Sequence, residues 1–252
     1  ALLLLDHLVK LPAAAAIQPV ASVAEAAPLT YDQQAMWLLH QLLPVDTSFN
    51  VAGAARITGA MDIPALRRAL QRLVARHAAL RTTFTVENGQ PVQIVQTSPA
   101  PTPELFVEID AAGWDEAALH NFLEQEAHRP FNLEEGPLLR LVLLKRASRE
   151  DSASRENSAA PEAILLLSLN HLITDFWSMA LLVQELYWFY ASAAGSGTEA
   201  PTSTQGSATQ AIELLPADYA HWQAQMLATP QGEALRDYWL EKLNGDLPRL
   251  DL

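Results

Sequence analysis

The chain has 252 residues, of which 50% are hydrophobic and 18% charged, and this composition is typical of a folded globular protein. Its 16 Lys and Arg against 29 Asp and Glu give a formal net charge of −13, so no basic excess exists to neutralise phosphates, and we expect no nucleic-acid partner. The absence of cysteine excludes a disulfide, a thiolate nucleophile and a cysteine-ligated zinc site, so serine, histidine and carboxylates must supply any chemistry.

The first residues predict neither a membrane span nor a cleaved leader. The apolar run at residues 2–5 is far shorter than the roughly 20 residues of a spanning helix. Because the chain begins at Ala1 without a basic region or a cleavage site, we interpret it as a piece of a longer, cytoplasmic polypeptide. Residues 12–28 are mostly Ala, Pro and Val without periodicity, which is typical of a linker. The chain therefore divides into an upstream helix remnant with a linker, 1–27, and a globular part, 28–252.

A helix is predicted to open the globular part. Thr30 is expected to cap this helix at Tyr31, and Gln33 is placed to complete a capping box. The apolar stripe that we expect to be buried consists of Met36, Leu39, Leu42 and Leu43.

The later elements alternate strands with helices. Asn88-Gly89 predicts a tight hairpin because both residues tolerate positive φ, and residues 163–169 form a continuous apolar run typical of a strand buried on both faces. In chain order we predict a strand at 51–58, a helix capped by Asp62 with apolar residues up to Leu80, hairpin strands at 82–86 and 91–95, a helix at 115–128, strands at 138–145 and 163–169, and helices at 178–193, 217–226 and 233–243. Residues 149–160 and 195–210 are expected loops. This order favours a mixed α/β layer structure.

One segment concentrates polar groups at the end of a predicted interior strand. His171 follows that strand, and Asp175 precedes the next helix. A histidine at a strand end can accept a proton from an attacking nucleophile or orient it. The spacing alone leaves a second interpretation open, in which His171 is a hydrogen-bonded core residue and Asp175 merely caps the helix.

Five stretches together resemble a known family. They are PLTYDQQAMW at 28–37, RHAALRTTF at 76–84, FNLEEGPLLR at 131–140, NHLITDF at 170–176 and DYAHW at 218–222. In this order they are similar to the motifs of the N-terminal lobe of a condensation domain from a nonribosomal peptide synthetase or a hybrid polyketide and peptide synthetase. The site stretch is similar to the family's His-His-x-x-x-Asp-Gly motif, with Asn170 at the first His and Phe176 at the Gly.

The resemblance implies amide formation between two thioesters carried on phosphopantetheine arms. The implied partners are upstream and downstream carrier proteins, and the lobe itself is expected to bind no cofactor. His171 is then the catalytic residue, and Asp175 is structural through an ion pair with Arg81. Asn170 keeps a polar side chain at the site but removes a titratable group. Phe176 and the following Trp177 either narrow the substrate channel or pack in the core, and burial habits favour core packing.

The resemblance also implies the fold class, a two-layer mixed-sheet α/β lobe of the chloramphenicol-acetyltransferase-like type. In the family the site lies between two lobes, so we interpret the chain as the N-terminal lobe without its C-terminal partner. We therefore expect negligible condensation activity from the isolated chain. Two other functions stay open: a degenerate, non-elongating scaffold or carrier-docking module in a polyketide synthase, and a coenzyme A-dependent acyltransferase of the same fold.

The remaining aromatic and titratable residues are interpreted as structural. Core packing rather than a channel lining is expected for Trp37, Trp188, Trp222 and Trp239. His77 is interpreted as a satisfied core histidine. His40 and His221 lack a ligand partner at a useful spacing, so no metal site is expected. Glu134-Glu135 predicts a solvated turn.

Overall fold

The computed structural model describes residues 16–20, 22–43, 47–97, 103–146, 162–195 and 212–246, and within these ranges it is a mixed α/β structure with two sheets. The elements are β1 (Ala26–Pro28), α2 (Tyr31–Leu42), β2 (Asn50–Thr58), α3 (Ile63–Arg76), the 3-10 helix η1 (Ala78–Arg81), β3 (Thr82–Glu87), β4 (Gln90–Val95), β5 (Phe106–Asp110), α4 (Glu116–Ala127), β6 (Leu139–Arg146), β7 (Glu162–Asn170), α5 (Phe176–Ala193), α7 (Pro216–Leu227) and α8 (Pro230–Lys242). The mixed α/β class predicted from the sequence is therefore confirmed. None of the helices in this part of the chain has the length and hydropathy of a membrane span.

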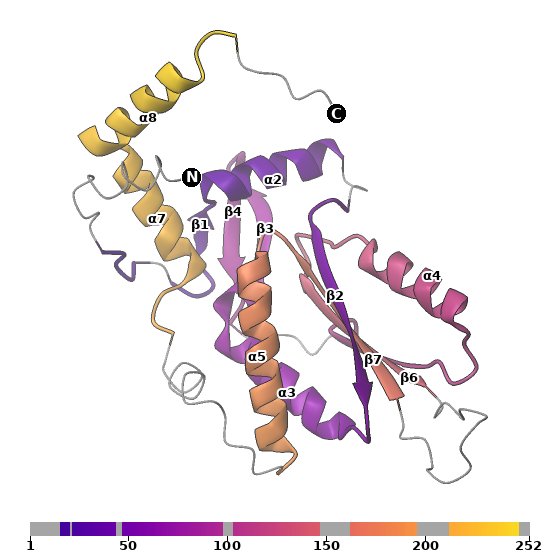
Figure 1. Cartoon of the computed structure of the whole chain (residues 1–252). Coiled ribbons are helices and arrows are strands. Elements are labelled where there is room, and N and C mark those ends of the chain that lie inside the picture. The colour runs from indigo at the N-terminus through magenta and orange to yellow at the C-terminus, as the bar shows by residue number, and fades with distance from the viewer. Residues whose placement is uncertain are drawn as a thin grey trace.

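The larger sheet has the order β2-β7-β6-β5. β7 is antiparallel to both of its neighbours, whereas β5 and β6 run parallel. Helices α3 and α5 lie on one face of this sheet and α4 lies on the other (Figure 1). Burial on both faces explains why β7 is an unbroken apolar run, as predicted.

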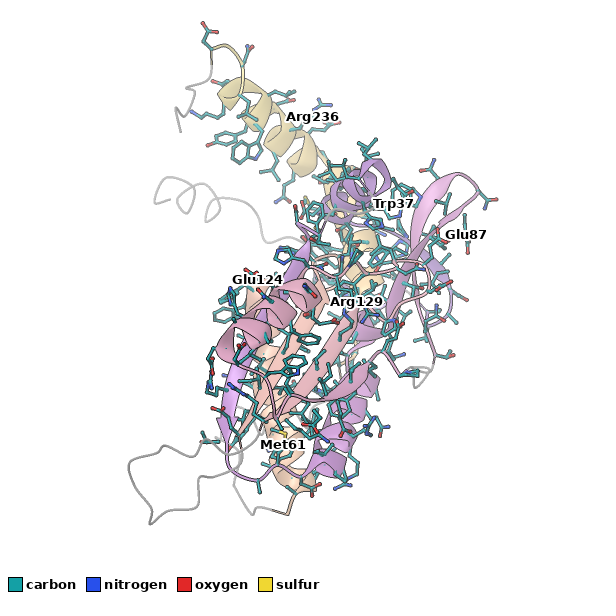
Figure 2. All side chains as sticks on the ribbon, turned by 90° about the vertical axis from the view of Figure 1, so that its right-hand side faces the viewer. Trp37, Met61, Glu87, Glu124, Arg129 and Arg236 are labelled. Carbon is teal, nitrogen blue, oxygen red and sulfur yellow. The ribbon has the colours of Figure 1, made fainter. Side chains whose placement is uncertain are left out.

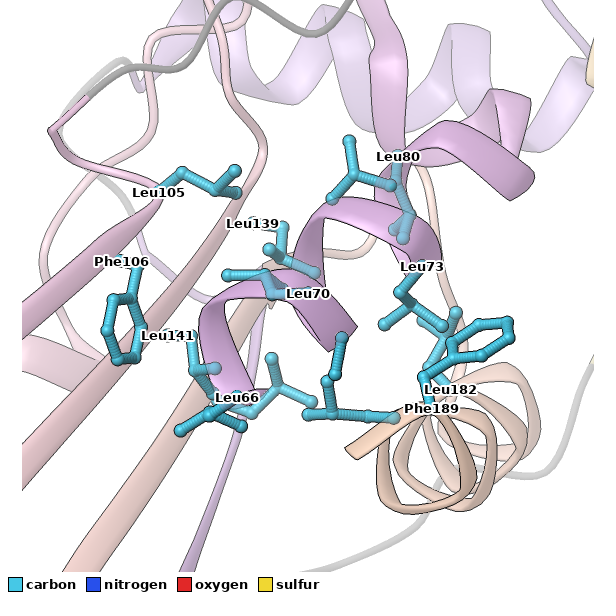
Figure 3. Packing of buried hydrophobic residues seen from close by; sticks show 14 of the residues in the cluster. Leu66, Leu70, Leu73, Leu80, Leu105, Phe106, Leu139, Leu141, Leu182 and Phe189 are labelled. Carbon is cyan, nitrogen blue, oxygen red and sulfur yellow. The ribbon is translucent and has the colours of Figure 1, made fainter. Parts of the chain in front are cut away.

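Helix α3 buries one face against the sheet and α5. Leu66, Leu70 and Leu73 on α3 are at most 3% exposed. They belong to the cluster that also contains Leu141 of β6 and Leu182 of α5 (Figure 3). Asp62 caps this helix by accepting from the Ala65 N–H at 2.8 Å, as the sequence predicted.

The smaller sheet has the order β1-β4-β3. Its β3-β4 hairpin turns at Asn88 and Gly89, with φ values of 52° and 76°, which confirms the prediction from this dipeptide. The interpretation of residues 12–28 as a linker is wrong for the last of them, because Ala26–Pro28 form β1 against β4. A strand of three residues is too short to produce a recognisable periodicity.

Helix α2 begins as predicted but buries a different face. Thr30 and Gln33 form the expected capping box. The residues that lie toward the body of the protein are Gln33, Met36, Trp37 and His40, all half-buried. Three of the predicted stripe residues, Leu39, Leu42 and Leu43, are instead 45%, 66% and 54% exposed. The apolar spacing correctly predicted a helix. It did not predict which face of the helix lies toward the body of the protein.

The other predicted helices and strands are present to within a few residues. Strand β5 was not predicted, because its pairing with β6 is distant in sequence. The predicted loop at 149–160, most of the segment 195–210 and the first 15 residues lie outside the described ranges.

Candidate active site

The candidate site is the loop that joins β7 to α5. The backbone N–H of Asn170 donates to the Leu138 carbonyl at 3.0 Å, and the N–H of His171 donates to the Phe49 carbonyl at 2.7 Å. Leu138 precedes β6 and Phe49 precedes β2, so the loop is held from both neighbours of β7. His171 is thereby fixed at the end of the central strand.

Asn170 shapes this loop through its buried side chain. Its Oδ1 accepts from the Leu172 N–H at 3.0 Å, and its carbonyl accepts from the Ile173 N–H at 3.1 Å. Leu172 packs in a second hydrophobic cluster, and Gln33 on α2 donates to its carbonyl at 3.0 Å. The amide therefore closes a local turn of the Asx type.

His171 is exposed, although its neighbours Asn170 and Leu172 are buried. The interpretation of His171 as a core histidine is therefore wrong. An exposed imidazole at a fixed backbone position can contact a molecule that approaches from solvent, as a general base must. Its catalytic role stays a prediction.

Asp175 is the N-cap of α5, as in the second interpretation that the spacing left open. Its Oδ1 accepts from the Ser178 N–H at 2.6 Å. Hydrogen bonds from the Ser178 side chain and backbone hold the pKa of Asp175 below its ordinary range, and positive charge on His171 adds a smaller effect in the same direction.

The predicted ion pair between Arg81 and Asp175 is wrong. Arg81 donates to the backbone carbonyls of Val74 and Gln96, at the end of η1. Asp175 is exposed and bonded to Ser178 instead. Because Arg81 donates to backbone carbonyls, its side chain does not need a carboxylate partner. Arg81 and Asp175 therefore stabilise separate local structures.

We expect Asp175→Ala to cost about 1 kcal/mol of folding free energy, the usual value of an N-cap, rather than the 3–5 kcal/mol of a broken buried pair. Because the folded pKa is lowered, this stabilisation is present above the ordinary carboxyl pKa of 3.8 and is lost as the pH falls below it. Urea unfolding of the variant at pH 7 and pH 3 measures both effects. Asp115→Ala removes the corresponding cap of α4 and is the matched control. A loss of more than 3 kcal/mol would restore the ion-pair interpretation.

A buried charge cluster that the sequence did not predict joins α3 to α5. Glu185 accepts from Arg76 Nε at 3.2 Å and lies 2.6 Å from His77 Nε2. Its side chain is only 9% exposed. Burial raises the pKa of Glu185, but the hydrogen bond and charge of His77, followed by those of Arg76, outweigh it and lower the pKa overall. The expectation that His77 is a satisfied, largely buried histidine is consistent with this geometry.

Two other motif residues hold segments together. Arg140 on β6 is 4% exposed and donates to the carbonyls of Pro130, Glu126 and Arg129, with its guanidinium 3.8 Å from the Phe131 ring centroid. Asp218 on α7 is 1% exposed and accepts from the N–H groups of Val20 and Leu215, both at 2.7 Å. These motif positions are explained by packing rather than by catalysis.

Phe176 and Trp177 begin α5 beside the site loop, and they are 82% and 75% exposed. The expectation that they pack in the core is therefore wrong. Of the four tryptophans expected in the core, Trp37 and Trp188 pack partly against it, whereas Trp239 is 46% exposed. Trp222 stacks on Tyr219 with ring centroids 5.5 Å apart.

No group of three or more potential metal ligands occurs among the described residues. A family model described as "Condensation domain" matches residues 23–252, which include the site loop and every motif residue discussed above. The chain belongs to the condensation domain family.

Relatives of this condensation domain are parts of peptide synthetases. It is 36% identical to one of the linear gramicidin synthase subunits of Brevibacillus parabrevis, in an alignment that covers 93% of the chain and 3% of that protein. It is 33% identical to the phosphinothricin tripeptide synthetase PhsC of Streptomyces viridochromogenes, covering 89% of the chain and 19% of that protein. The chain therefore spans a small part of the relatives that it matches.

Solved structures share the fold of this condensation domain. The starter condensation domain of rhizomide synthetase RzmA superposes with a TM-score of 0.68 at 21% identity, covering 88% of this chain and 49% of that one. The X-domain in complex with OxyB from teicoplanin biosynthesis gives a TM-score of 0.70 at 24% identity, covering 94% and 47%. These matches support the chloramphenicol-acetyltransferase-like class expected from the sequence.

Proposed function

We propose that this condensation domain contributes His171 to amide formation between two thioesters carried by the phosphopantetheine arms of an upstream and a downstream carrier protein. The acceptor amine attacks the donor thioester carbon, the new C–N bond forms, and the C–S bond breaks. His171 takes the proton from the amine and returns it to the leaving thiolate. The thioester supplies its own leaving group, so this step needs no protein nucleophile.

The single observation that carries the proposal is the exposed imidazole of His171 on a rigidly held loop. Its backbone is bonded to Phe49, and the adjacent Asn170 closes the turn. A fixed position matters because approach and orientation supply much of the rate enhancement in bimolecular reactions. Positive charge on His171 contributes to the lowered pKa of Asp175, so the two side chains interact electrostatically.

A second candidate is a non-elongating scaffold that binds carriers without joining their substrates. The observations that favour it are Asn170 and Phe176 at two motif positions, together with the exposure of Phe176 beside the site. The Asn170 amide does not titrate, so it cannot exchange a proton with His171 as a histidine at this motif position could. An exposed aromatic pair fits contact with another protein surface.

Transfer between carriers tests the proposal. In the complete synthase, the donor acyl group should move to the aminoacyl carrier, and mass spectrometry of the two carriers should detect the change. The 252-residue chain alone should transfer nothing measurable under the same conditions, because positioning of two substrates requires walls beyond this lobe. A coenzyme A thioester replacing the donor carrier tests the remaining acyltransferase alternative. Unchanged carriers in an otherwise active synthase would favour the scaffold.

A further inference from the structure

A side-chain hydrogen bond joins α2 to the site loop. Gln33 Nε2 on α2 donates to the Leu172 carbonyl at 3.0 Å, although the two residues are 139 positions apart in the sequence. Figure 2 shows Trp37 of the same helix toward the end of the molecule opposite Met61, which follows β2. Because β2 and β7 are antiparallel, Met61 marks the end of the sheet at which β7 begins. Helix α2 therefore lies at the other end, where β7 stops and the site loop starts.

The Gln33 amide is held in one orientation by its other contacts. Its Oε1 accepts from the Thr30 N–H at 3.0 Å, within the capping box, and from Gln93 Nε2 at 3.4 Å. Gln93 is 1% exposed and also donates to the Pro28 carbonyl at 2.9 Å, so its own side chain is fixed. With Oε1 used as the acceptor, Nε2 is the end of the amide that donates to Leu172.

This bond fixes the chain immediately after His171. The backbone up to the His171 N–H is bonded to the segments that precede β2 and β6. The next residue, Leu172, packs its side chain in the second hydrophobic cluster and accepts from Gln33 through its carbonyl. His171 therefore lies between two attachments. Because the rotamers open to a side chain depend on the backbone that carries it, these attachments limit the directions of the imidazole.

We infer that Gln33 is a positioning residue for His171: its amide holds the site loop so that the imidazole keeps the orientation that proton transfer needs. The catalytic part of this inference rests on the proposed function, whereas the fixing of the loop is measurable without any reaction. Since Gln33 acts through His171, its effect on the rate should disappear once the imidazole is removed.

The variant Gln33→Glu separates this role from the part that Gln33 plays in α2. Glutamate is a usual capping-box residue, and a carboxylate is favourable in the first turn of a helix, so α2 should keep its stability. An ionised carboxylate cannot donate to the Leu172 carbonyl, so the bond to the loop is lost. Gln34→Glu is the matched control, because it adds the same charge one residue along the helix. Gln34 donates to the Leu29 carbonyl at 3.0 Å, outside the site loop.

Amide hydrogen exchange in the 252-residue chain, followed by NMR at neutral pH, measures the fixing of the loop. In Gln33→Glu, the N–H groups of Leu172 and Ile173, which close the turn of the loop, should exchange about fivefold to tenfold faster, the effect of losing one hydrogen bond. The backbone N–H of residue 33, inside the capping box, should exchange as before. Gln34→Glu should change none of these rates. Unchanged exchange at Leu172 and Ile173 in Gln33→Glu would overturn the inference.

Transfer between the carriers of the complete synthase tests the action through His171. Gln33→Glu should lower the single-turnover rate about fivefold to tenfold, and Gln34→Glu should not. In the His171→Ala background, Gln33→Glu should cause no further loss. An equal loss in both backgrounds would be a general structural effect and would overturn the positioning role. If His171→Ala alone leaves transfer unchanged, the proposed function fails and the catalytic role of Gln33 fails with it, whereas the exchange result on the loop stands by itself.

Discussion

Replacing His171 with alanine in the complete synthase should lower product formation by about 10²–10⁴-fold, the usual contribution of a positioned general base. The imidazole is exposed and its backbone is bonded to Phe49, so truncation at Cβ removes the proton acceptor without removing a core contact. Folding should therefore be unchanged. Single-turnover transfer from donor carrier to acceptor carrier, followed by mass spectrometry, measures the effect on the chemical step.

His120→Ala is the matched control for this variant. His120 is also exposed, with 72% of its side chain accessible, and it lies on α4 away from the site loop. Its loss should leave transfer unchanged. If His171→Ala also transferred at the original rate, His171 would not be catalytic, and a scaffold role would explain the exposed residues at the start of α5 better.

Glu185→Ala should destabilise the domain by about 2–4 kcal/mol, because it removes the buried carboxylate that Arg76 and His77 share. The expected value is at the lower end for a broken buried pair, since the Arg76 and His77 side chains are 15% and 22% exposed. Urea unfolding of the 252-residue chain at pH 7 measures it. Glu135→Ala, which removes an exposed carboxylate, should change stability by less than about 0.5 kcal/mol.

The pH dependence of this effect has a definite sign. The pKa of Glu185 is lowered in the folded protein, so its stabilisation is complete above the ordinary carboxyl pKa of 4.5 and is lost as the pH falls through the lower folded value. The difference between the original chain and Glu185→Gln should therefore be largest near neutral pH and shrink in acid. A difference that grew in acid would contradict the ionised carboxylate.

Local signals in the sequence predicted local structure well. The caps at Thr30 and Asp62 and the turn at Asn88-Gly89 are confirmed, because each depends on a few neighbouring residues. Motif order indicated the condensation domain family, and the family match confirms it. Features that depend on distant segments were harder to predict, such as the pairing of β5 with β6.

Charged partners were even harder to predict. Arg81 was assigned to Asp175, whereas the buried carboxylate in this region is Glu185, which lies more than one hundred residues from its partners Arg76 and His77 in the sequence. Glu185 lies on the α5 face that packs against α3, and a charge at an inward-facing helical position was the available signal. Nothing in the neighbouring sequence predicted that Phe176 and Trp177 are exposed, because aromatic side chains are usually at least partly buried.

The contact of Asp218 with Val20 has a practical consequence for engineering. One carboxylate on α7 binds the backbone beside β1, and Gln223 on the same helix accepts from the Tyr31 N–H at 2.9 Å at the start of α2. Segments nearly two hundred residues apart are thus fastened to each other. A recombination junction placed between α5 and α7 would pair an N-terminal strand with a foreign helix, so chimeric synthases should inherit α7, β1 and α2 from the same parent.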